Sequence, residues 1–354
     1  MNTVKKDIVV NILKENKVDA LLIYSSENRY WFTNFRSSEG YLLITKSKAI
    51  LFVDGRYITD AKKNVKNVDK IVEFGDVFQL INQEIENYKI KNLGFEDEFI
   101  VYRQFLWFKN QLNVKLKAVD LKKLRVIKTD AEIKIIKQAC EITSKTFSDL
   151  VQLIKVEMSE KEIDALIYKL LLKNGADSYS FFPVVASGNR GALPHGPSTK
   201  KLIAQNDFLT IDFGCTYQGY CSDMTRTIAF NQPKQELIKI YNIVKEAQEK
   251  GIKAIKPGVS TKEIDAICRN YITAKGYGKY FIHSTGHGLG IQVHEFPRVS
   301  PYCDYKLAEN MIVTVEPGIY IPNLGGVRIE DDILVTKNGY QILTKANKDL
   351  IIIK

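Results

Sequence analysis

The chain has 354 residues, 45% of them hydrophobic, and this length predicts two globular domains rather than one. The formal net charge is +10, but the basic residues are spread along the chain, so the charge does not indicate a nucleic-acid partner. There is no run of 18 apolar residues, which excludes a membrane span, and five cysteines without a CxxC pair fit reduced thiols in a cytoplasm.

The first part of the chain alternates predicted helices and strands. An amphipathic helix is expected within residues 1–20, where apolar residues recur at i,i+4 spacing. Apolar runs bounded by turn residues then predict strands at 19–25, 41–47, 49–55 and 91–96, with a helix at 77–88 before the last of them.

The pattern changes after residue 122. Thr129 and Glu132 form a capping box, which predicts the start of a long helix that reaches about Asp149. We therefore place a domain boundary near residue 122, which gives domains 1–122 and 123–354.

The second part contains an internal repeat. Residues 159–175 match residues 260–276, and each copy begins with a Ser-x-x-Glu capping box and ends at a glycine. Strand-like segments follow in both copies, at 206–214 and 310–318. Two matched elements in the same order predict a duplication rather than a chance similarity.

The histidines are unevenly distributed. Three of the four lie in residues 281–295, "FIHSTGHGLGIQVHE", and the fourth is His195. Alternating glycines disfavour a helix by roughly 1 kcal/mol each, and they predict an extended segment that a ligand or another backbone approaches closely. The stretch is not HExxH, which excludes a helical zinc-protease site, and a dinucleotide loop is only a weak alternative because GxGxxG is absent.

Both copies of the repeat carry acids at corresponding places. The strand-like segments hold Asp212 and Glu316, and a second acid follows each of them, Asp223 and Glu330. Packing the copies face to face would gather four carboxylates, whose pKa values would rise unless cations neutralised them. Two divalent ions would balance the four charges, and a neutral His287 could complete the shell. Taken singly, each acid could instead be a turn residue, a cap or part of a solvated acidic run.

Read together, the motifs TIDFG, SDMTRT, HSTGHGLGIQVHE, TVEPG and RIEDD resemble the metal-dependent superfamily of aminopeptidase P, prolidase and methionine aminopeptidase, which has the pita-bread fold. The resemblance implies an α+β protein, in which a creatinase-like α/β N-terminal domain precedes a duplicated pita-bread catalytic domain. It implies that the metal ligands are Asp212, Asp223, His287, Glu316 and Glu330. It also implies that the other histidines line the active site: His195, His283 and His294.

The resemblance extends upstream. The segment "YSSENRYWFTNFRSSEGYLLITKSKAILFVDGRY" is similar to the N-terminal domain shared by aminopeptidase P, prolidase and creatinase. Methionine aminopeptidases lack this domain and creatinase-like enzymes lack the full carboxylate set, so both are set aside. Tyr320 and Arg328 match positions of the proline-specific branch, which implies that they bind substrate together with His283. Strand alternation also puts Arg328 on the same face as Glu330.

The family implies a dinuclear-metal Xaa-Pro aminopeptidase, acting on peptides with proline at the second position. Glu316 would shuttle a proton, while His195 and His294 would steady the tetrahedral intermediate and the proline side. An oxygen-rich shell favours Mn²⁺, with Co²⁺ and Zn²⁺ as alternatives.

Two other functions stay open. A prolidase would pair the proline carboxylate with a fixed cation, for which Arg36 and Arg298 are weak candidates. A metal-free pita-bread protein would be a binding module, but such relatives lose ligands, whereas this chain keeps all five. Relatives with this N-terminal domain further imply a homodimer.

Overall fold

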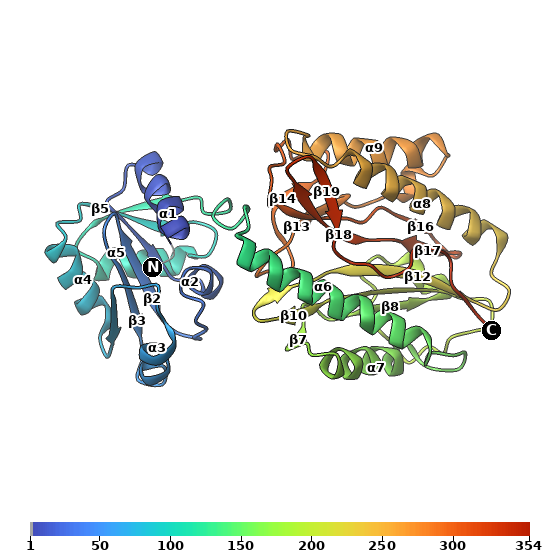
Figure 1. Ribbon diagram of the computed structural model, residues 1–354, viewed down its shortest axis with the longest axis horizontal. Coiled ribbons are helices and arrows are strands. Elements are labelled where there is room, and N and C mark those ends of the chain that lie inside the picture. The colour runs from blue at the N-terminus through green and yellow to red at the C-terminus, as the bar shows by residue number, and fades with distance from the viewer. Residues whose placement is uncertain (1–2) are drawn as a thin grey trace. The chain divides into compact units, whose positions relative to one another are not determined.

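A computed structural model describes residues 3–354 of the chain (Figure 1). The chain divides into two compact units, one ending at Arg125 and the other running from Val126 to Lys354. Within the described residues, no helix combines the length and the apolar character needed to cross a membrane.

The N-terminal unit is one mixed sheet with helices packed against it. Its strands are β1 (Ala20–Ile23), β2 (Tyr41–Thr45), β3 (Ala49–Val53), β4 (Lys70–Glu73), β5 (Asn92–Glu96) and β6 (Lys115–Val119). Its helices are α1 (Thr3–Asn16), α2 (Ser26–Thr33), α3 (Ile58–Asn64), α4 (Val77–Asn87) and α5 (Tyr102–Gln111). The helix at 77–88 and the four strands expected from the sequence are all present.

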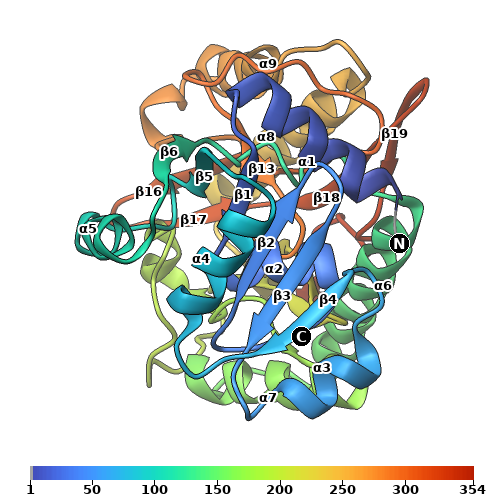
Figure 2. The same cartoon turned by 90° about the vertical axis from the view of Figure 1, so that its left-hand side faces the viewer.

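The strand order in this sheet is β4-β3-β2-β1-β5-β6. β2 runs antiparallel to β1 and β3, and every other neighbouring pair is parallel. β1, β2 and β3 are buried along their whole length, as expected of strands covered on both faces. Figure 2 shows β2, β3 and β4 side by side in this unit.

The second unit is built from two similar halves. The first half holds α6 (Asp130–Val151), α7 (Glu160–Lys173), β7 (Ser178–Tyr179), β8 (Val184–Ser187), the short helix η1 (Gly188–Ala192), β9 (Phe208–Phe213), β10 (Cys215–Tyr217), β11 (Tyr220–Cys221) and β12 (Met224–Phe230). The second holds α8 (Gln235–Ala254), α9 (Thr261–Ala274), η2 (Gly278–Tyr280), β13 (Gly286–Gly288), β14 (Glu295–Val299), β15 (Ile312–Val315), β16 (Gly318–Ile321), β17 (Gly325–Arg328), β18 (Asp331–Thr336), β19 (Gly339–Ile342) and β20 (Ile352–Ile353).

The strands of this unit lie between two helix pairs. The main sheets have the orders β20-β12-β9-β8 and β14-β13-β15-β18-β19. Figure 1 shows α8 and α9 on one side of these strands and α6 and α7 on the other. Each half has its own apolar core, and the equivalent residues Ile163 and Ile264 are fully buried in the two cores.

The structure confirms the internal repeat. Ser159 and Ser260 both make capping boxes at the starts of α7 and α9, as Thr129 does for α6. Each serine also forms an isolated bridge to the segment before the next long strand, to Leu202 and Lys306 respectively. β9 then pairs antiparallel with β12, as β15 does with β18, so matching strands of the two halves approach the same region.

Candidate active site

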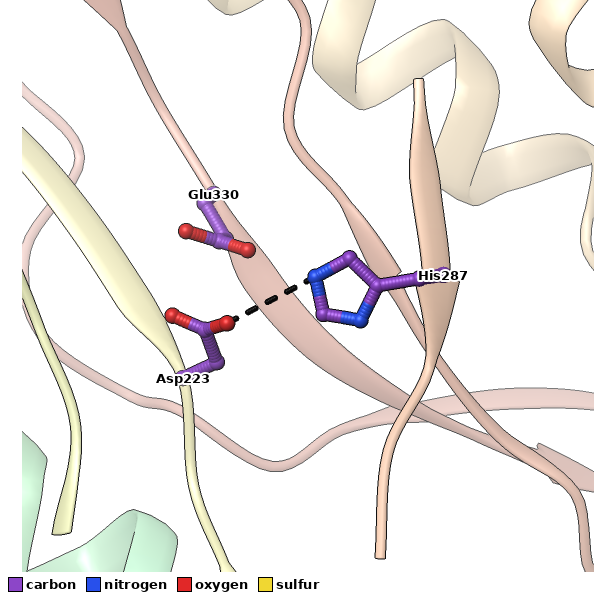
Figure 3. A group of neighbouring side chains, drawn as sticks. All are labelled: Asp223, His287 and Glu330. Atoms are coloured by element: carbon purple, nitrogen blue, oxygen red, sulfur yellow. Dashed lines mark ion pairs between the residues drawn. The ribbon is translucent and has the colours of Figure 1, made fainter. Parts of the chain in front are cut away.

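Two acids and one histidine from different strands meet inside the second unit. Asp223 lies just before β12, His287 is the middle residue of β13, and Glu330 lies just before β18. One ligand atom from each of the three lies within 4.8 Å of the others, and all three side chains are buried (Figure 3). The His287 Nε2 atom lies 3.6 Å from Asp223 Oδ2. The cluster therefore combines residues from both halves of the repeat.

The other two predicted ligands adjoin this cluster. Glu316 follows β15, and its Oε1 atom lies 3.3 Å from His287 Nε2. Asp212 lies on β9 directly opposite Thr225 of β12. The Asp212 charge raises the pKa values of both Asp223 and Glu330, so it lies close to both acids. The structure thus brings all five residues together.

The glycines around His287 allow this approach. A Cβ atom on Gly286 would lie 2.1 Å from the Thr314 carbonyl oxygen, and one on Gly288 would lie 2.5 Å from the Phe296 carbonyl oxygen. Only glycine fits where β13 passes this close to its neighbours. The extended segment predicted from the sequence is present, and it is another backbone that approaches it.

Burial and mutual repulsion dominate the electrostatics of the cluster. Burial, followed by the charge of Glu330, raises the pKa of Asp223 well above its usual range. Burial and the charge of Glu316 do the same to the pKa of Glu330. Burial also raises the pKa of Asp212, although Arg328 opposes the change. Ionising all of these carboxylates would therefore require nearby cations to neutralise their charge.

Several carboxylate oxygens in the cluster have no donor. Asp212 Oδ1, Asp223 Oδ1 and Glu330 Oε1 are buried, and within residues 3–354 none of them accepts a hydrogen bond. Buried polar atoms are nearly always paired, so orphaned oxygens that converge on one place need another partner. Carboxylate and imidazole donors of this kind suit divalent cations, and the residues present therefore fit the metal ions that the sequence implies.

The His287 ring is oriented for ligation. Its Nδ1 atom lies 3.0 Å from the carbonyl oxygen of Gly288, which leaves Nε2 directed towards the acids. A carbonyl partner at one ring nitrogen fixes the tautomer that offers the other nitrogen to a metal. Burial alone would lower the pKa of His287, but hydrogen bonding to Glu316 raises it above its ordinary value.

A polar chain leads away from the cluster. His283 Nε2 lies 2.9 Å from Tyr320 Oη, and Arg328 Nη1 donates to the same hydroxyl at 2.7 Å. Arg328 also pairs with Asp212 and donates from Nε to Thr225 Oγ1 at 3.1 Å. Thr225 Oγ1 in turn donates to Glu330 Oε2 at 2.7 Å. The three predicted substrate residues are thus connected to two predicted metal ligands.

His195 and His294 lie at the exposed edge of the site. The His294 ring packs edge-on against His287, with 4.3 Å between ring centroids. Desolvation and the neighbouring His287 lower the pKa of His294 to about 4. The charge of His195 contributes to lowering the pKa values of both His283 and His294, which puts it within electrostatic reach of both rings. All four histidines therefore gather around one place.

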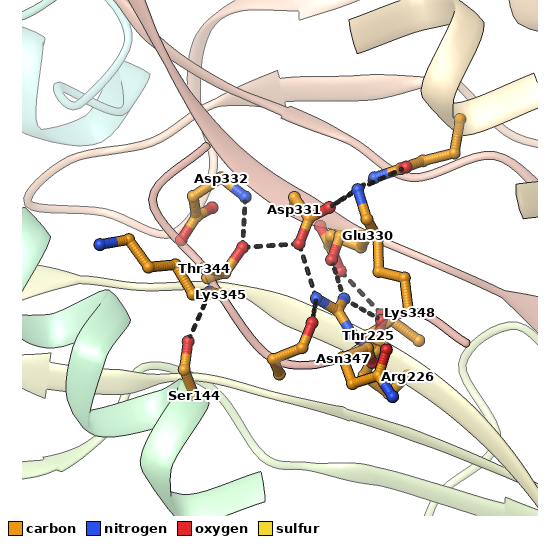
Figure 4. Close-up of polar contacts among 12 residues, drawn as sticks. Ser144, Thr225, Arg226, Glu330, Asp331, Asp332, Thr344, Lys345, Asn347 and Lys348 are labelled. Atoms are coloured by element: carbon orange, nitrogen blue, oxygen red, sulfur yellow. Dashed lines mark hydrogen bonds and ion pairs between the residues drawn. The ribbon is translucent and has the colours of Figure 1, made fainter. Parts of the chain in front are cut away.

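The "EDD" segment differs from a solvated acidic run, because Glu330, Asp331 and Asp332 are all buried. Asp331 pairs with Arg226 at 2.7 Å and with Lys348 at 2.9 Å (Figure 4). Asp332 Oδ2 accepts from the backbone N–H of Asp223 at 2.9 Å. Asp332 thus holds Asp223 directly, and Asp331 holds the arginine that donates to the backbone carbonyl group of Glu330.

Sequence reasoning missed these supporting residues. Thr225 joins Arg328 to Glu330, and Arg226 donates to the backbone carbonyl groups of Thr225 and Glu330. One signal was present in SDMTRT, where Thr225 follows Asp223 by two residues and so shares its strand face. No local pattern marks Arg226, because all of its partners except the adjacent Thr225 are more than 100 residues away.

Comparison with known proteins places the chain in a family. Residues 134–337 match Metallopeptidase family M24, and residues 7–127 match the Creatinase/Prolidase N-terminal domain. The chain is 42% identical to an Xaa-Pro dipeptidase of Pyrococcus horikoshii, with 97% of each chain covered. The solved Xaa-Pro dipeptidase from Bacillus anthracis has a TM-score of 0.96 and 42% identity over 99% of each chain. The X-Pro aminopeptidase from Thermotoga maritima MSB8 has a TM-score of 0.90 and 36% identity, covering 97% of this chain and 100% of that one.

These matches confirm the expected fold class, a creatinase-like N-terminal domain followed by a pita-bread domain. The acid and histidine cluster lies within the segment that matches the peptidase family. The chain is therefore a hydrolase of metallopeptidase family M24 that carries a creatinase/prolidase N-terminal domain.

Proposed function

We propose that the protein is a metal-dependent exopeptidase that hydrolyses the bond between an N-terminal residue Xaa and proline. The observation that carries this proposal is the chain from His283 through Tyr320 and Arg328 to Asp212, which connects the three candidate substrate residues to the acid cluster. The names of the relatives support it, since the matched proteins of P. horikoshii and B. anthracis are Xaa-Pro dipeptidases.

We assign two divalent ions to the five ligands Asp212, Asp223, His287, Glu316 and Glu330. Bound in this way, such ions lower the pKa of a water molecule and polarise the carbonyl group of the scissile bond. The hard oxygen donors favour Mn²⁺, with Co²⁺ and Zn²⁺ as alternatives. Elemental analysis of protein purified with manganese present tests both the stoichiometry and the metal.

Glu316 is our candidate for the proton carrier. Without metal, burial raises its pKa, but a hydrogen bond from protonated His287 outweighs that effect and lowers the pKa of Glu316 to about 2. With metal bound, the nearby cations would keep the carboxylate ionised instead. An ionised carboxylate at this position can accept a proton from water and return it to the leaving nitrogen. His294, with a pKa of about 4, is neutral at pH 7 and can donate one ring N–H to the developing oxyanion. We assign His195 to binding the proline side of the substrate.

The chemistry of proline fits a site of this kind. A peptide bond to proline has no N–H, so a pocket that offers no acceptor there binds proline without leaving a donor unpaired. Tyr320 and His283 satisfy each other's polar atoms, which leaves mainly their ring surfaces for the pyrrolidine.

The sequence favours an aminopeptidase that accepts longer peptides, and we retain that assignment as the main proposal. One observation favours the dipeptidase instead. Arg298 on β14 pairs in register with His287, its side chain is exposed, and its charge helps to lower the pKa of His294. A guanidinium at the rim of the site could bind the carboxylate of a terminal proline.

Substrate length separates these two proposals. An aminopeptidase should cleave Xaa-Pro-Xaa-Xaa peptides at least as fast as the Xaa-Pro dipeptide, and Arg298→Ala should change neither rate by more than about twofold. A dipeptidase should prefer Xaa-Pro, and Arg298→Ala should raise its KM about tenfold or more, because a charge-assisted bond contributes roughly 1.5–3 kcal/mol. Equal rates before residues other than proline would remove proline specificity altogether.

Alanine variants separate metal ligands from substrate groups. His287→Ala should lower both the metal content and the rate, since it removes a buried ligand. His294→Ala and His195→Ala should lower kcat by about a hundredfold while the metal stays bound, because they are assigned to the oxyanion and to the proline side of the substrate rather than to the ions. Metal analysis beside steady-state kinetics makes the comparison, and metal loss in His294→Ala would show that its role was wrongly assigned.

Two further expectations remain proposals. All five cysteines are free in the described structure, which supports a reducing compartment such as the cytoplasm. We also propose a homodimer, which sedimentation of the purified protein would test.

A further inference from the structure

The segment that carries His195 is held at both ends by one buried carboxylate. Glu160, the first residue of α7, has no exposed surface. Its Oε1 atom accepts from the N–H and the hydroxyl of Ser187, both at 2.9 Å. Its Oε2 atom accepts from the N–H and hydroxyl of Thr199 at 3.0 and 2.6 Å. Ser187 and Thr199 flank segment 188–198, which holds η1 and the loop that follows it, so the carboxylate fixes the distance between its ends.

An arginine within the segment completes this arrangement. Arg190 Nε donates to Glu160 Oε2 at 3.0 Å, and its guanidinium also donates to the carbonyl oxygen of Pro197. The carbonyl oxygen of Pro194, the residue before His195, accepts from Arg328 Nη1 at 3.2 Å. The position of this segment is therefore coupled to the arginine that holds Asp212.

A second acid–arginine pair holds the segment that carries His283. Asp265 on α9 is 1% exposed, and its Oδ1 atom accepts from Thr285 Oγ1 at 2.8 Å and from Thr285 N at 3.2 Å. Arg269 pairs with Asp265 at 2.8 Å. The same guanidinium donates to the carbonyl oxygens of Phe281 and His283 at 3.0 and 2.8 Å. The backbone on both sides of His283 is thereby fixed.

The internal repeat supplies a comparison for each acid. Thr261 stands where the first copy has Glu160, and its hydroxyl donates to Cys303 O at 2.6 Å and accepts from Tyr305 N at 3.3 Å. Asp164 stands where the second copy has Asp265, and it accepts from Tyr179 Oη at a long 3.4 Å. The hydroxyl of Thr261 is therefore sufficient for closing its copy of the repeat, so closure alone does not require the Glu160–Arg190 pair.

Stability alone is a poor reason for such pairs. Desolvating two charges offsets much of their attraction, and well-packed apolar residues are often as stable or more so. From the geometry we infer that Glu160–Arg190 and Asp265–Arg269 are positioning residues, the first pair for His195 and the second for His283. The inference rests on the proposed function for the roles of the two histidines, whereas the positions of their rings can be tested without it.

Histidine ring NMR can test the placement without turnover. Tag-free protein reloaded with diamagnetic Zn²⁺ should show four histidine Cε1–H signals, because the chain has four histidines. Single His→Ala variants assign them. Glu160→Gln should shift or broaden the His195 signal and leave that of His283 unchanged, while Asp265→Asn should do the reverse. Each variant is thus the control for the other.

Glu162→Gln is a matched control within the same helix. Glu162 caps α7 by accepting from Ser159 N at 2.7 Å, and within residues 3–354 it forms no hydrogen bond with segment 188–198. It should leave both ring signals in place. The Glu160→Gln variant could keep enough of the Glu160 hydrogen bonds to leave His195 in place, or it could fail to fold. Glu160→Thr is the second variant for either case, because it copies the residue of the second repeat and removes the bridge to Ser187.

A double-mutant cycle tests the consequence for the reaction. Glu160→Thr should lower kcat/KM on an Xaa-Pro peptide about tenfold, since small displacements of an oriented group are costly. In a His195→Ala background the same change should cost less than about twofold, because residues that act as a unit are not additive. The zinc content should stay unchanged in every variant.

The outcomes are separable. Equal rate losses in both backgrounds, lost metal, or ring signals that respond to Glu160 and Asp265 alike would overturn the positioning roles. A wild-type protein that cleaves no Xaa-Pro peptide would overturn the proposed function instead, and the NMR comparison would still decide whether each pair holds its own histidine.

Discussion

Replacing Asp223 by asparagine, or Glu330 by glutamine, is expected to lower kcat/KM by about a thousandfold or more, because a divalent metal site depends on its anionic ligands. Both side chains are buried, and each has one oxygen without a hydrogen-bond partner in the described structure. The amide keeps the shape of the acid but supplies only a neutral ligand. Metal content measured on the same preparations should fall from close to two equivalents per chain.

Glu309→Gln provides the control, since this acid is exposed in the same unit. It should leave both the rate and the metal unchanged. The loss of kcat/KM in Asp332→Asn should be smaller than in the ligand variants and larger than in Glu309→Gln, because Asp332 Oδ2 positions Asp223 through a backbone N–H. If Asp332→Asn were more damaging than Glu330→Gln, the acid assigned as the ligand would be the wrong one.

Much of the fold was predictable because its signals are local. A capping box needs only two residues three apart, and the predicted boxes at Thr129, Ser159 and Ser260 are all present. The glycines that end the repeated helices, Gly175 and Gly276, have φ values of 100° and 88°, in the left-handed region that glycine enters without strain.

The ligands were also accessible to sequence reasoning, for a different reason. A duplicated strand–acid pattern fixes which residues converge once the two halves pack together, and Asp223 and Glu330 lie within one cluster as that pattern predicts. The roles assigned to these residues remain predictions, since geometry alone does not test them.

The supporting contacts could not be predicted, because they depend on pairs that are distant in the sequence. Arg226 joins Asp331 to the backbone of the C-terminal segment at Ala346 and Asn347 (Figure 4). In the sequence, Asp331 and Asp332 resemble ordinary solvated acids. Only the fold shows that both are fully buried. Asp331 pairs with two cations, and Asp332 accepts a hydrogen bond from the backbone of Asp223.

Removing the metal with a chelator is expected to abolish turnover and to change how stability depends on pH. Burial raises the pKa of Asp332 to about 7 and the pKa values of Asp223 and Glu330 well above their usual range. For acids whose folded pKa is raised, the folded state binds more protons than the unfolded state. Their stabilising contribution is therefore full at low pH and is lost as the pH rises through the folded pKa.

The melting temperature of the metal-free protein should consequently fall between pH 6.5 and pH 8. His283 and His294 have lowered pKa values and act in the opposite sense around pH 6.5, where they still titrate when unfolded. The three buried acids Asp223, Glu330 and Asp332 together outweigh them over this range. Asp332 alone should contribute a loss of about 1 kcal/mol over this range, or roughly 2–4 °C for a unit of this size. Ligation by metal requires deprotonated acids, so added Mn²⁺ should stabilise the protein more at pH 8 than at pH 6.5. A metal-free melting temperature that rises over the same range, or full activity after thorough chelation, would contradict the charge balance that we assign to the five ligands.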